Sequence, residues 1–281
     1  MRHTDVVALQ LALVDRFTQP LELDIPGYDR HLITPEMREM AMASPAYQAR
    51  SRSYRQMAAA LESCDAWHVG PEITDLLAEA SLSLPPTTAI TETMLPAPQA
   101  LIVFDQIVRF PTVTIGGFAW RVLPDNQLML VMLHGHTMHE RVEVTDTVPY
   151  GVALRETGLP SIDRTMPAFR LLASALLLIE QRIITPAERR EVANRAARKR
   201  LSRGRGTLPA VRVVRLVERS TPTASDESRP VDWSHRWMVR GHWRNQWYPK
   251  TRTHRPVYVL PYVKGPDDKP LVIRRTVVDV S

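Results

Sequence analysis

Two consecutive prolines, Pro85 and Pro86, separate a helical pattern from a strand pattern in the first half of the chain. A proline ring restricts the backbone and removes an amide donor, so a helix stops at such a pair. Before the prolines, apolar residues recur at helical spacing. After them, strand-like segments cover residues 100–104, 112–122 and 127–133. This order of elements, helices followed by a small antiparallel sheet, predicts the α+β class.

Helix starts are visible throughout the region before the prolines. Thr34 and Ser44 each stand directly before a proline, an arrangement typical of an N-cap followed by the first helical residue. Residues 6–17 form a short amphipathic segment, and residues 71–80 are a further candidate. The N-terminal part is therefore expected to be mainly helical.

The second half of the chain predicts a basic helix and another sheet. Residues 167–184 regain helical spacing, and Thr185-Pro186-Ala187-Glu188 fits a capping box, so a new helix is expected over residues 187–201. Four mainly antiparallel strands should follow. They are expected over residues 210–218, 233–247, 257–263 and 270–280, separated by segments rich in turn residues.

Charge is segregated along the chain beneath a formal net charge of +6. From Arg182 onward there are 23 Lys+Arg against 9 Asp+Glu, net +14, which leaves 13 against 21, net −8, for the residues before it. We interpret residues 1–182 as an acidic domain suited to protein recognition and residues 183–281 as a basic domain suited to RNA or the ribosome. A basic part of this kind either meets phosphate or packs on the acidic part.

Several classes of protein are disfavoured by what the sequence lacks. The single cysteine, Cys64, excludes an intramolecular disulfide and a cysteine-based zinc site, and it fits a reducing cytoplasm. The longest apolar run, residues 171–179, is too short for a membrane span, and no signal peptide is recognisable, so a cytoplasmic protein without a membrane partner is expected. Phosphate loops, dinucleotide fingerprints and nucleophile elbows are absent, so no cofactor and no catalytic residue is expected.

Four of the six tryptophans fall between Trp233 and Trp247, interspersed with arginines and histidines. In a single strand, alternate side chains face opposite sides, which places the tryptophans on one face. The other face would carry Arg236, Arg240 and Arg244 as a ladder suited to phosphate. A bulge at Gly241 would instead shift the alternation and bring tryptophans beside arginines.

The expected helix over residues 187–201 is the second candidate for contact with phosphate. It carries Arg189, Arg195 and Arg198 and only a narrow apolar stripe. Two interpretations remain open: a helix that faces nucleic acid, or a surface helix whose arginines pair with the acidic part.

A histidine cluster, His134-Gly-His136-Thr-Met-His139, is the best candidate for metal chemistry, because imidazoles close in sequence can converge on zinc. It resembles the His-x-His-x-x-His signature of metallo-hydrolases that include nucleases. Met138 stands where that signature carries an aspartate, so one ligand is missing. We therefore predict no metal site, with His134, His136 and His139 as its weak candidates.

Three segments carry a resemblance to known families. They are Val239-Arg-Gly-His-Trp-Arg-Asn-Gln246, Arg255-Pro-Val-Tyr-Val-Leu-Pro-Tyr-Val-Lys-Gly-Pro266, and Leu95-Pro-Ala-Pro98 with Phe104. Together they resemble a group of mostly uncharacterised proteins from actinobacterial phages and other mobile elements. The first two are also similar to the type V-A anti-CRISPR family that suppresses production of its target nuclease.

That resemblance implies a mechanism and a shared surface. The implied mechanism is recognition of the nuclease's emerging N-terminal peptide during translation, followed by loss of the messenger RNA. The residues implied as the shared surface are Arg240, His242, Trp243, Arg244, Asn245, Gln246, Lys264 and Gly265.

Three functions follow from the residues and the resemblance. The first is a non-enzymatic phage or mobile-element regulator that binds RNA or the ribosome through its basic C-terminal sheet and recognises a host or nascent protein through its acidic part. The second is a nuclease or toxin whose histidines perform acid–base chemistry. The third is a protein-interaction module in which the basic sheet binds its own acidic part. The sequence sets no oligomeric state.

Overall fold

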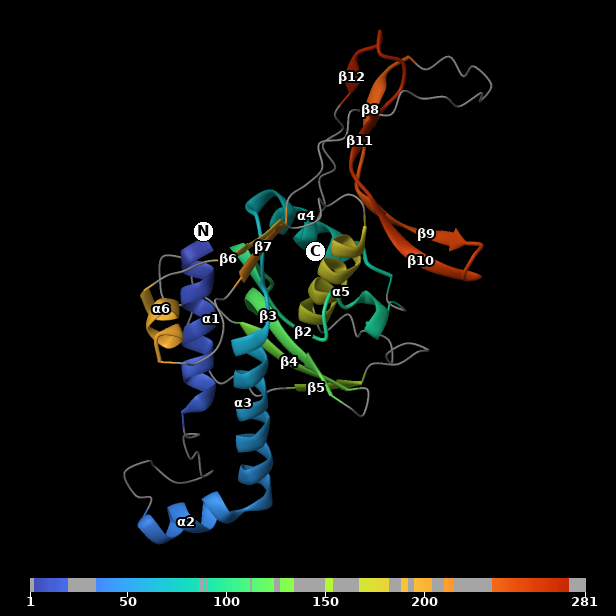
Figure 1. Ribbon diagram of the computed structural model, residues 1–281. Helices are drawn as coiled ribbons and strands as arrows, with labels where there is room; N and C mark the ends of the chain where they lie inside the picture. The colour runs from blue at the N-terminus through green and yellow to red at the C-terminus, as the bar shows by residue number, and fades with distance from the viewer. Residues whose placement is uncertain are drawn as a thin grey trace.

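The computed structural model describes residues 3–19, 34–85, 88, 90–111, 113–123, 127–133, 150–153, 167–181, 188–191, 195–203, 210–214 and 234–272. Helices and sheets are mixed, with a helical N-terminal part and antiparallel sheets at the C-terminal end (Figure 1). The predicted α+β class is thereby confirmed. Among these residues no helix is long and apolar enough to span a bilayer.

The N-terminal helices begin where the sequence predicts. They are α1 (His3–Thr18), α2 (Pro35–Ala43), α3 (Pro45–Ser63) and α4 (Pro71–Ser83). The hydroxyls of Thr34 and Ser44 accept hydrogen bonds of 3.3 Å from the backbone amides of Met37 and Tyr47, so both residues are N-caps. A short 3-10 turn, η2 (Glu92–Met94), precedes the first long strand.

A seven-stranded sheet lies at the centre of the molecule, in the order β5-β4-β3-β2-β1-β7-β6. Its strands are β1 (Ala66–Val69), β2 (Gln99–Arg109), β3 (Thr114–Val122), β4 (Gln127–Leu133), β5 (Tyr150–Ala153), β6 (Glu188–Glu191) and β7 (Ala210–Val214). The strands β2 to β5 are antiparallel, as expected. The sheet is nevertheless larger than the sequence predicts, because β1 pairs in parallel with both β2 and β7.

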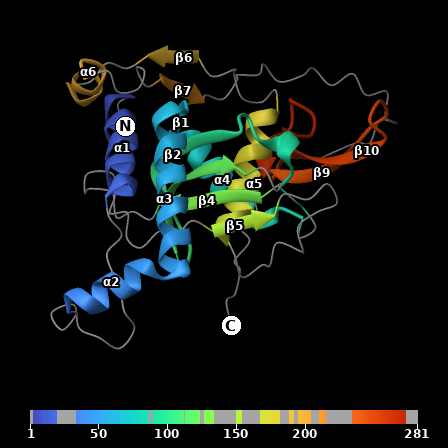
Figure 2. The same ribbon diagram turned by 60° about the horizontal axis from the view of Figure 1, so that its bottom comes forward.

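Helices cover both faces of this sheet, and each face has its own hydrophobic core (Figure 2). Alternate residues of β2 point to opposite sides: Ile102 and Phe104 pack with α4 and with α5 (Pro167–Glu180), whereas Leu101 and Val103 pack with α1 and α3. The β7 strand contributes to both cores, through Val214 on one face and Val211 on the other. Residues that follow position 182 thus complete the sheet of the preceding part.

The predicted helix over residues 187–201 is only half correct. Residues 188–191 form the strand β6, which pairs with β7, and the helix α6 (Arg195–Leu201) begins afterwards. A free strand edge offers backbone donors and acceptors to a neighbouring segment, and pairing there outweighs a local helix-start signal. The cationic helix is therefore about half as long as predicted.

The C-terminal strands form two sheets instead of the single four-stranded sheet predicted. The pairs are β10-β9, and β11-β8-β12 with β12 parallel to β8. The strands are β8 (Arg236–Val239), β9 (His242–Tyr248), β10 (Thr253–Val259), β11 (Tyr262–Lys264) and β12 (Leu271–Val272). Of the expected strand at 210–218, residues 210–214 form β7, next to the edge of the seven-stranded sheet, and the remainder lies outside the described residues. The expected run at 233–247 is broken between β8 and β9.

Close packing explains that break. A Cβ atom on Gly241 would lie 2.1 Å from the hydroxyl of Tyr258 and 3.2 Å from the ring of Pro261. Because β9 pairs with β10 and β8 pairs with β11, the segment is one long hairpin that bends at Gly241 on one strand and at Leu260-Pro261 on the other. We call residues 236–264 the bent hairpin.

Candidate nucleic-acid interface

The bent hairpin lies in a stretch of sequence that has no acidic side chain. Between Trp233 and Pro266 the chain carries seven Lys+Arg and no Asp or Glu. A surface of one sign attracts polyanions over several ångströms, with a strength that falls with salt. The hairpin region thus carries seven of the 23 Lys+Arg of the C-terminal part, with no acidic residue among them.

The inner half of β9 anchors the hairpin to the helices. The indole Nε1 of Trp243 donates a 2.8 Å hydrogen bond to the carbonyl of Ala80 in α4, and its ring meets Tyr258 edge-on at 5.2 Å. The backbone amide of Tyr258 donates to Gln181 Oε1 over 3.2 Å, and Tyr258 is 1% exposed. Trp243, one of the implied surface residues, therefore lies half-buried in the docking contact.

The three arginines expected to form a ladder are placed differently from one another. Arg236 is half-buried, and its Nε donates a 2.8 Å hydrogen bond to the carbonyl of Lys269. Arg240 is exposed at the bend, and the guanidinium of Arg244 is exposed and donates to Gln246 Oε1 over 2.6 Å. Because the hairpin bends between them, Arg236 and Arg244 lie in separate sheets and no continuous ladder forms.

The other residues that the resemblance implies as a shared surface are either exposed or required by the local backbone. His242, Asn245 and Lys264 are exposed, and Gln246 is half-buried. Gly265 has a φ of 117°, and a Cβ there would meet the carbonyl oxygen of His235 at 2.8 Å, so this position requires glycine for the turn itself.

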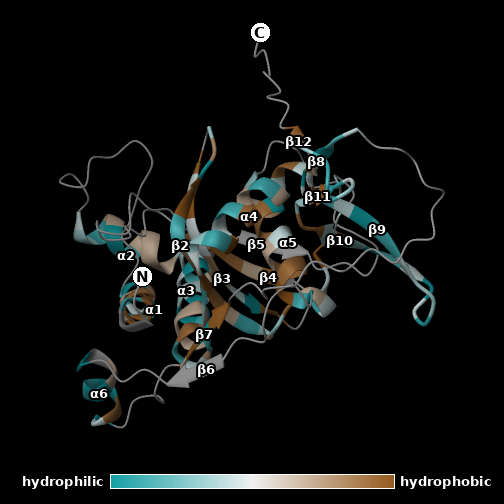
Figure 3. Ribbon diagram, turned by 90° about the horizontal axis from the view of Figure 1, so that it is seen from above, coloured by the Kyte–Doolittle hydropathy of each residue, from teal (hydrophilic) through white to brown (hydrophobic). Residues whose placement is uncertain are grey.

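The outer half of the β9–β10 hairpin extends beyond the helices (Figure 1, Figure 3). Trp247 and Tyr248 are 43% and 40% exposed there. Trp247 pairs directly with His254, with ring centroids 4.8 Å apart, and the guanidinium of Arg255 lies 5.9 Å from the Tyr248 ring.

Sequence reasoning did not find this outer group. It assigned residues 248–256 to a turn, whereas β10 already begins at Thr253. The turn itself occupies only residues 249–252, so Thr253 and His254 lie opposite Tyr248 and Trp247 across the hairpin. Sequence reasoning also placed the tryptophans together on one face of a single strand, whereas the structure leaves Trp243 half-buried and Trp247 43% exposed.

A second cationic surface lies on α6, at the opposite end of the molecule from β9 and β10 (Figure 1, Figure 2). Arg195 and Arg198 are exposed on this helix. Arg189 belongs to β6, opposite Arg212 of β7 in the strand register. The residues predicted to contact nucleic acid thus form two separate surfaces, not one.

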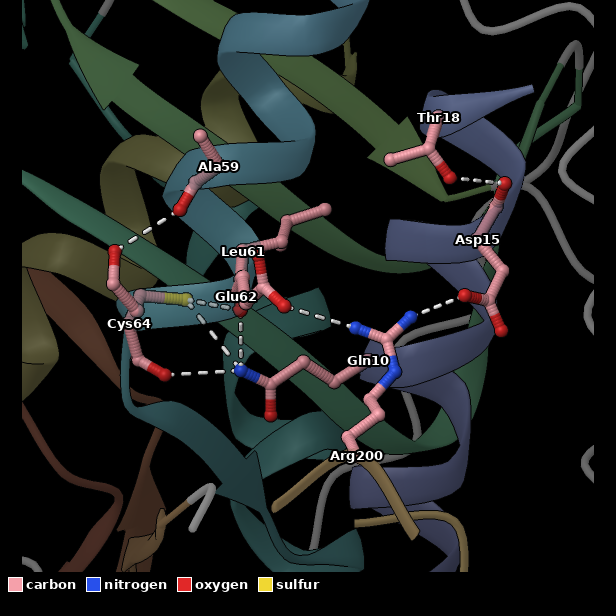
Figure 4. A network of polar contacts seen from close by, with 9 residues as sticks. Gln10, Asp15, Thr18, Ala59, Leu61, Glu62, Cys64 and Arg200 are labelled. Atoms are coloured by element: carbon pink, nitrogen blue, oxygen red, sulfur yellow. Dashed lines mark hydrogen bonds and ion pairs between the residues drawn. The ribbon is translucent and has the colours of Figure 1, made fainter. Parts of the chain in front are cut away.

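Part of the basic C-terminal region pairs with the acidic part, as one open interpretation expected. The guanidinium of Arg200 lies between the carboxylates of Asp15 and Glu62 (Figure 4), with 3.1 Å to Glu62 Oε1. Arg212 contacts Asp65 at 2.8 Å.

Arg255 likewise contacts Glu180 of α5 at 2.9 Å. Among the residues that the structure describes, Arg240 and Arg244 have no carboxylate partner and remain available to an external anion.

The candidates for metal chemistry find no site within the part of the chain that the structure describes. His134, His136 and His139 lie outside that part, and within it no group of three or more His, Cys, Asp or Glu is arranged to hold a metal. Cys64 is buried, and burial together with the charge of Asp65 raises the pKa of its thiol to about 12.

Comparison with known proteins shows similarity to a solved structure. No protein-family model matches the chain, and no curated protein sequence matches it. Among solved structures, the crystal structure of AcrVA2 is similar over 93% of this chain and 99% of that chain, with 14% identity and a TM-score of 0.46. A similarity of this size carries no assignment of function, which therefore depends on the surface described above.

Proposed function

We propose that this chain is a non-enzymatic regulator of phage or mobile-element origin that binds RNA, free or within the ribosome, and lowers expression of a target. The observation that carries the proposal is the bent hairpin, whose exposed Arg240, His242, Arg244 and Lys264 lie in a segment without acidic residues. The origin and the effect on expression rest on the resemblance of residues 239–246 and 255–266 to the type V-A anti-CRISPR family.

Phosphate contact is the chemistry that these side chains supply. An arginine directs two donors at one phosphate, and each contact displaces a condensed counterion from the RNA. Arg200, Arg212 and Arg255 already contact carboxylates, so they are not assigned to RNA. The two exposed arginines of the hairpin, Arg240 and Arg244, are the principal phosphate ligands in this proposal.

The acidic part, residues 1–182, is proposed to recognise a host or nascent protein. Its helix α2 buries none of its residues, and Met40 and Met42 are 77% and 40% exposed. Methionine side chains are flexible and polarisable and adapt to apolar segments of a partner. A regulator with this division would hold a protein at one end and RNA at the other.

The test compares two double variants that remove the same charge. Arg240→Ala with Arg244→Ala should weaken binding to RNA and ribosomes and reduce the slope of log affinity against log salt by about 1.4, which is about 0.7 for each lost phosphate contact. The matched control is Arg195→Ala with Arg198→Ala on α6, which should leave both quantities unchanged. Arg236 is kept because it holds the backbone of Lys269.

Two results would contradict this assignment. Unchanged binding of the hairpin double variant across the salt range would exclude Arg240 and Arg244 as phosphate ligands. A loss confined to the α6 variant would transfer the interface to that helix.

A protein-interaction module is the second candidate, and one observation favours it. The three-stranded sheet leaves Met238, Val263 and Leu271 49%, 42% and 40% exposed, on strands that none of the described helices covers (Figure 1). Exposed apolar side chains grouped on one element are typical of protein contacts. Pull-down from host lysate discriminates the two: partners retained after ribonuclease treatment favour the module, and partners lost favour RNA.

A further inference from the structure

We propose that the outer half of the β9–β10 hairpin is a stacking site for unpaired RNA bases, built on Trp247 and His254. This inference rests on the proposed RNA binding and specifies its ligand as single-stranded RNA. Phosphate contacts by Arg240 and Arg244 do not distinguish paired from unpaired RNA, whereas an aromatic platform requires bases that have left a helix.

The position of Trp247 is the first support. Trp243 and Trp247 share one face of β9, and Trp243 completes the docking on α4. Trp247 lies four residues further out, beyond that contact, and is 43% exposed. An exposed indole contributes nothing to the core and leaves a large apolar face in water, which suits it to contact with a ligand.

The ring of Trp247 is held in place by its neighbour across the hairpin. His254 is directly opposite in the register, with ring centroids 4.8 Å apart and an angle of 49° between the rings. Strand pairing fixes both backbones, so the two rings form a small aromatic surface that needs little ordering when a base arrives.

The opposite face of the hairpin carries a second exposed aromatic ring, here beside a cation. Tyr248 is 40% exposed, and the guanidinium of Arg255 lies 5.9 Å from its ring centroid. Glu180 holds that guanidinium through a 2.9 Å hydrogen bond. An RNA strand that crosses the end of the hairpin therefore meets an aromatic face on either side.

The turn supplies cations next to these rings. Lys250 and Arg252 are both exposed between β9 and β10. Arg252 has a φ of 49°, the left-handed region that glycine or asparagine normally occupies. An arginine at this position has a conformational cost, and it places a positive charge where the phosphates of stacked nucleotides would pass.

RNA fits this surface better than an acidic peptide does. Every base has a face that stacks on an indole, and every nucleotide adds a phosphate for a neighbouring cation. A peptide rich in Asp and Glu would use the cations but leave the aromatic faces without a partner. The combination of exposed rings and cations, without an acidic residue from Trp233 to Pro266, favours single-stranded nucleic acid.

The experiment measures binding of the full chain to a uridine oligonucleotide and to an abasic oligonucleotide of equal length and charge. Trp247→Ala should weaken binding to the uridine oligonucleotide by roughly 5- to 150-fold, the value expected for loss of one stacked base. The same variant should bind the abasic oligonucleotide as the unchanged protein does. Trp247→Phe should retain most of the affinity because it keeps an aromatic face.

The control for removal of an exposed aromatic is Tyr262→Ala, since Tyr262 is 41% exposed on β11 outside the site. It should change neither affinity, and thermal unfolding verifies that each variant is folded. The inference is overturned if Trp247→Ala binds uridine normally, or if it loses equal affinity for both oligonucleotides.

Two further outcomes separate the alternatives. An unchanged protein that binds neither oligonucleotide contradicts the proposed function itself, whereas uridine binding that is insensitive to Trp247 contradicts only the stacking site. Binding of a poly-glutamate peptide that depends on Trp247 as strongly as RNA does would also overturn the inference and assign the surface to an acidic peptide.

Discussion

At the scale of single residues, Gly241 decides the shape of the cationic surface. Tyr258 is almost fully buried, and its hydroxyl occupies the space that a Cβ of residue 241 would need, at 2.1 Å. The hairpin bends at this contact, and the bend separates Arg236 from Arg240 and Arg244. The absence of a Cβ at position 241 therefore permits the bend. The arginines expected to form one ladder are divided between two sheets.

We predict that Gly241→Ala lowers the free energy of unfolding by about 1–3 kcal/mol, because overpacking forces the Tyr258 ring to move. Urea denaturation measures the change. Gly116→Ala is the matched control: its Cβ would have only an ordinary contact of 3.7 Å, and we expect about 0.5 kcal/mol or less.

Tyr258→Phe tests the same contact from the other side. The hydroxyl of Tyr258 is buried and has no hydrogen-bond partner among the described residues, so its removal should be nearly neutral for stability. In the Gly241→Ala background it should restore part of the lost stability, since ring carbon Cζ would still lie within 2.7 Å. Purely additive effects would contradict this packing account.

Cys64 provides a prediction about reactivity and pH. Burial, and next the charge of Asp65, raise the pKa of its thiol from 9.0 to about 12, so a thiol reagent at neutral pH should modify it only when the chain unfolds. Because the folded state binds this proton more tightly than the unfolded state, its stabilising effect is complete below pH 9. That effect should be lost as pH rises towards 12. Labelling of the native protein at the rate seen in urea would contradict the prediction.

At the scale of elements, the arginines of the short helix α6 divide into one that forms ion pairs with other helices and others that are exposed to solvent. Its residue Arg200 fastens the helix to α1 and α3 through Asp15 and Glu62 (Figure 4). Arg195 and Arg198 stay exposed on the same helix. A run of arginines that reads as one cationic face is thus divided into a structural contact and a solvated surface.

We predict that Arg200→Ala lowers the free energy of unfolding by about 1 kcal/mol and that added salt reduces this difference, because both partners are partly exposed. Arg198→Ala removes the same charge from an exposed position and should leave stability unchanged. Thermal unfolding at two salt concentrations checks both variants. An equal effect of the two would show that net charge, and not the ion pairs, is responsible.

At the scale of the whole molecule, the acidic and basic parts are connected through a shared sheet. Strand β7, from the basic part, pairs with the full length of β1, from Ala66 with Val211 to Val69 with Val214. Val211 and Val214 are buried in the cores on opposite faces of the sheet. The acidic and basic parts of the sequence therefore pack closely together in one sheet, although their charges are segregated along the chain.

Truncation tests whether residues 1–182 fold independently of the rest of the chain. We predict that a chain ending at residue 182 unfolds at a lower temperature than the full chain, because β1 loses a parallel partner and both cores lose valines. Circular dichroism during heating measures the shift, and binding of a hydrophobic dye reports the exposed cores. An unchanged melting temperature would contradict the prediction and support two independent domains.

Local signals predict the first third of the structure well, because they act between neighbours in the sequence. The N-caps at Thr34 and Ser44 satisfy amides three residues away, and proline stops a helix through its own ring. The continuous apolar runs at residues 100–104 and 128–133 likewise identify strands with two buried faces. Candidate cations such as Arg240 and Arg244 are also visible directly in the sequence.

By itself, the sequence determined the class of the fold, the starts of the N-terminal helices, the segregation of charge and the absence of acidic residues from the hairpin. Only the tertiary structure decided that residues 188–191 pair as a strand, that Gly241 bends the hairpin against Tyr258, and that Trp243 docks while Trp247 stays exposed. The physical reason is distance along the chain. These outcomes depend on contacts between residues well separated in the sequence, such as Tyr258 for Gly241 and Ala80 for Trp243, and no local spacing encodes them.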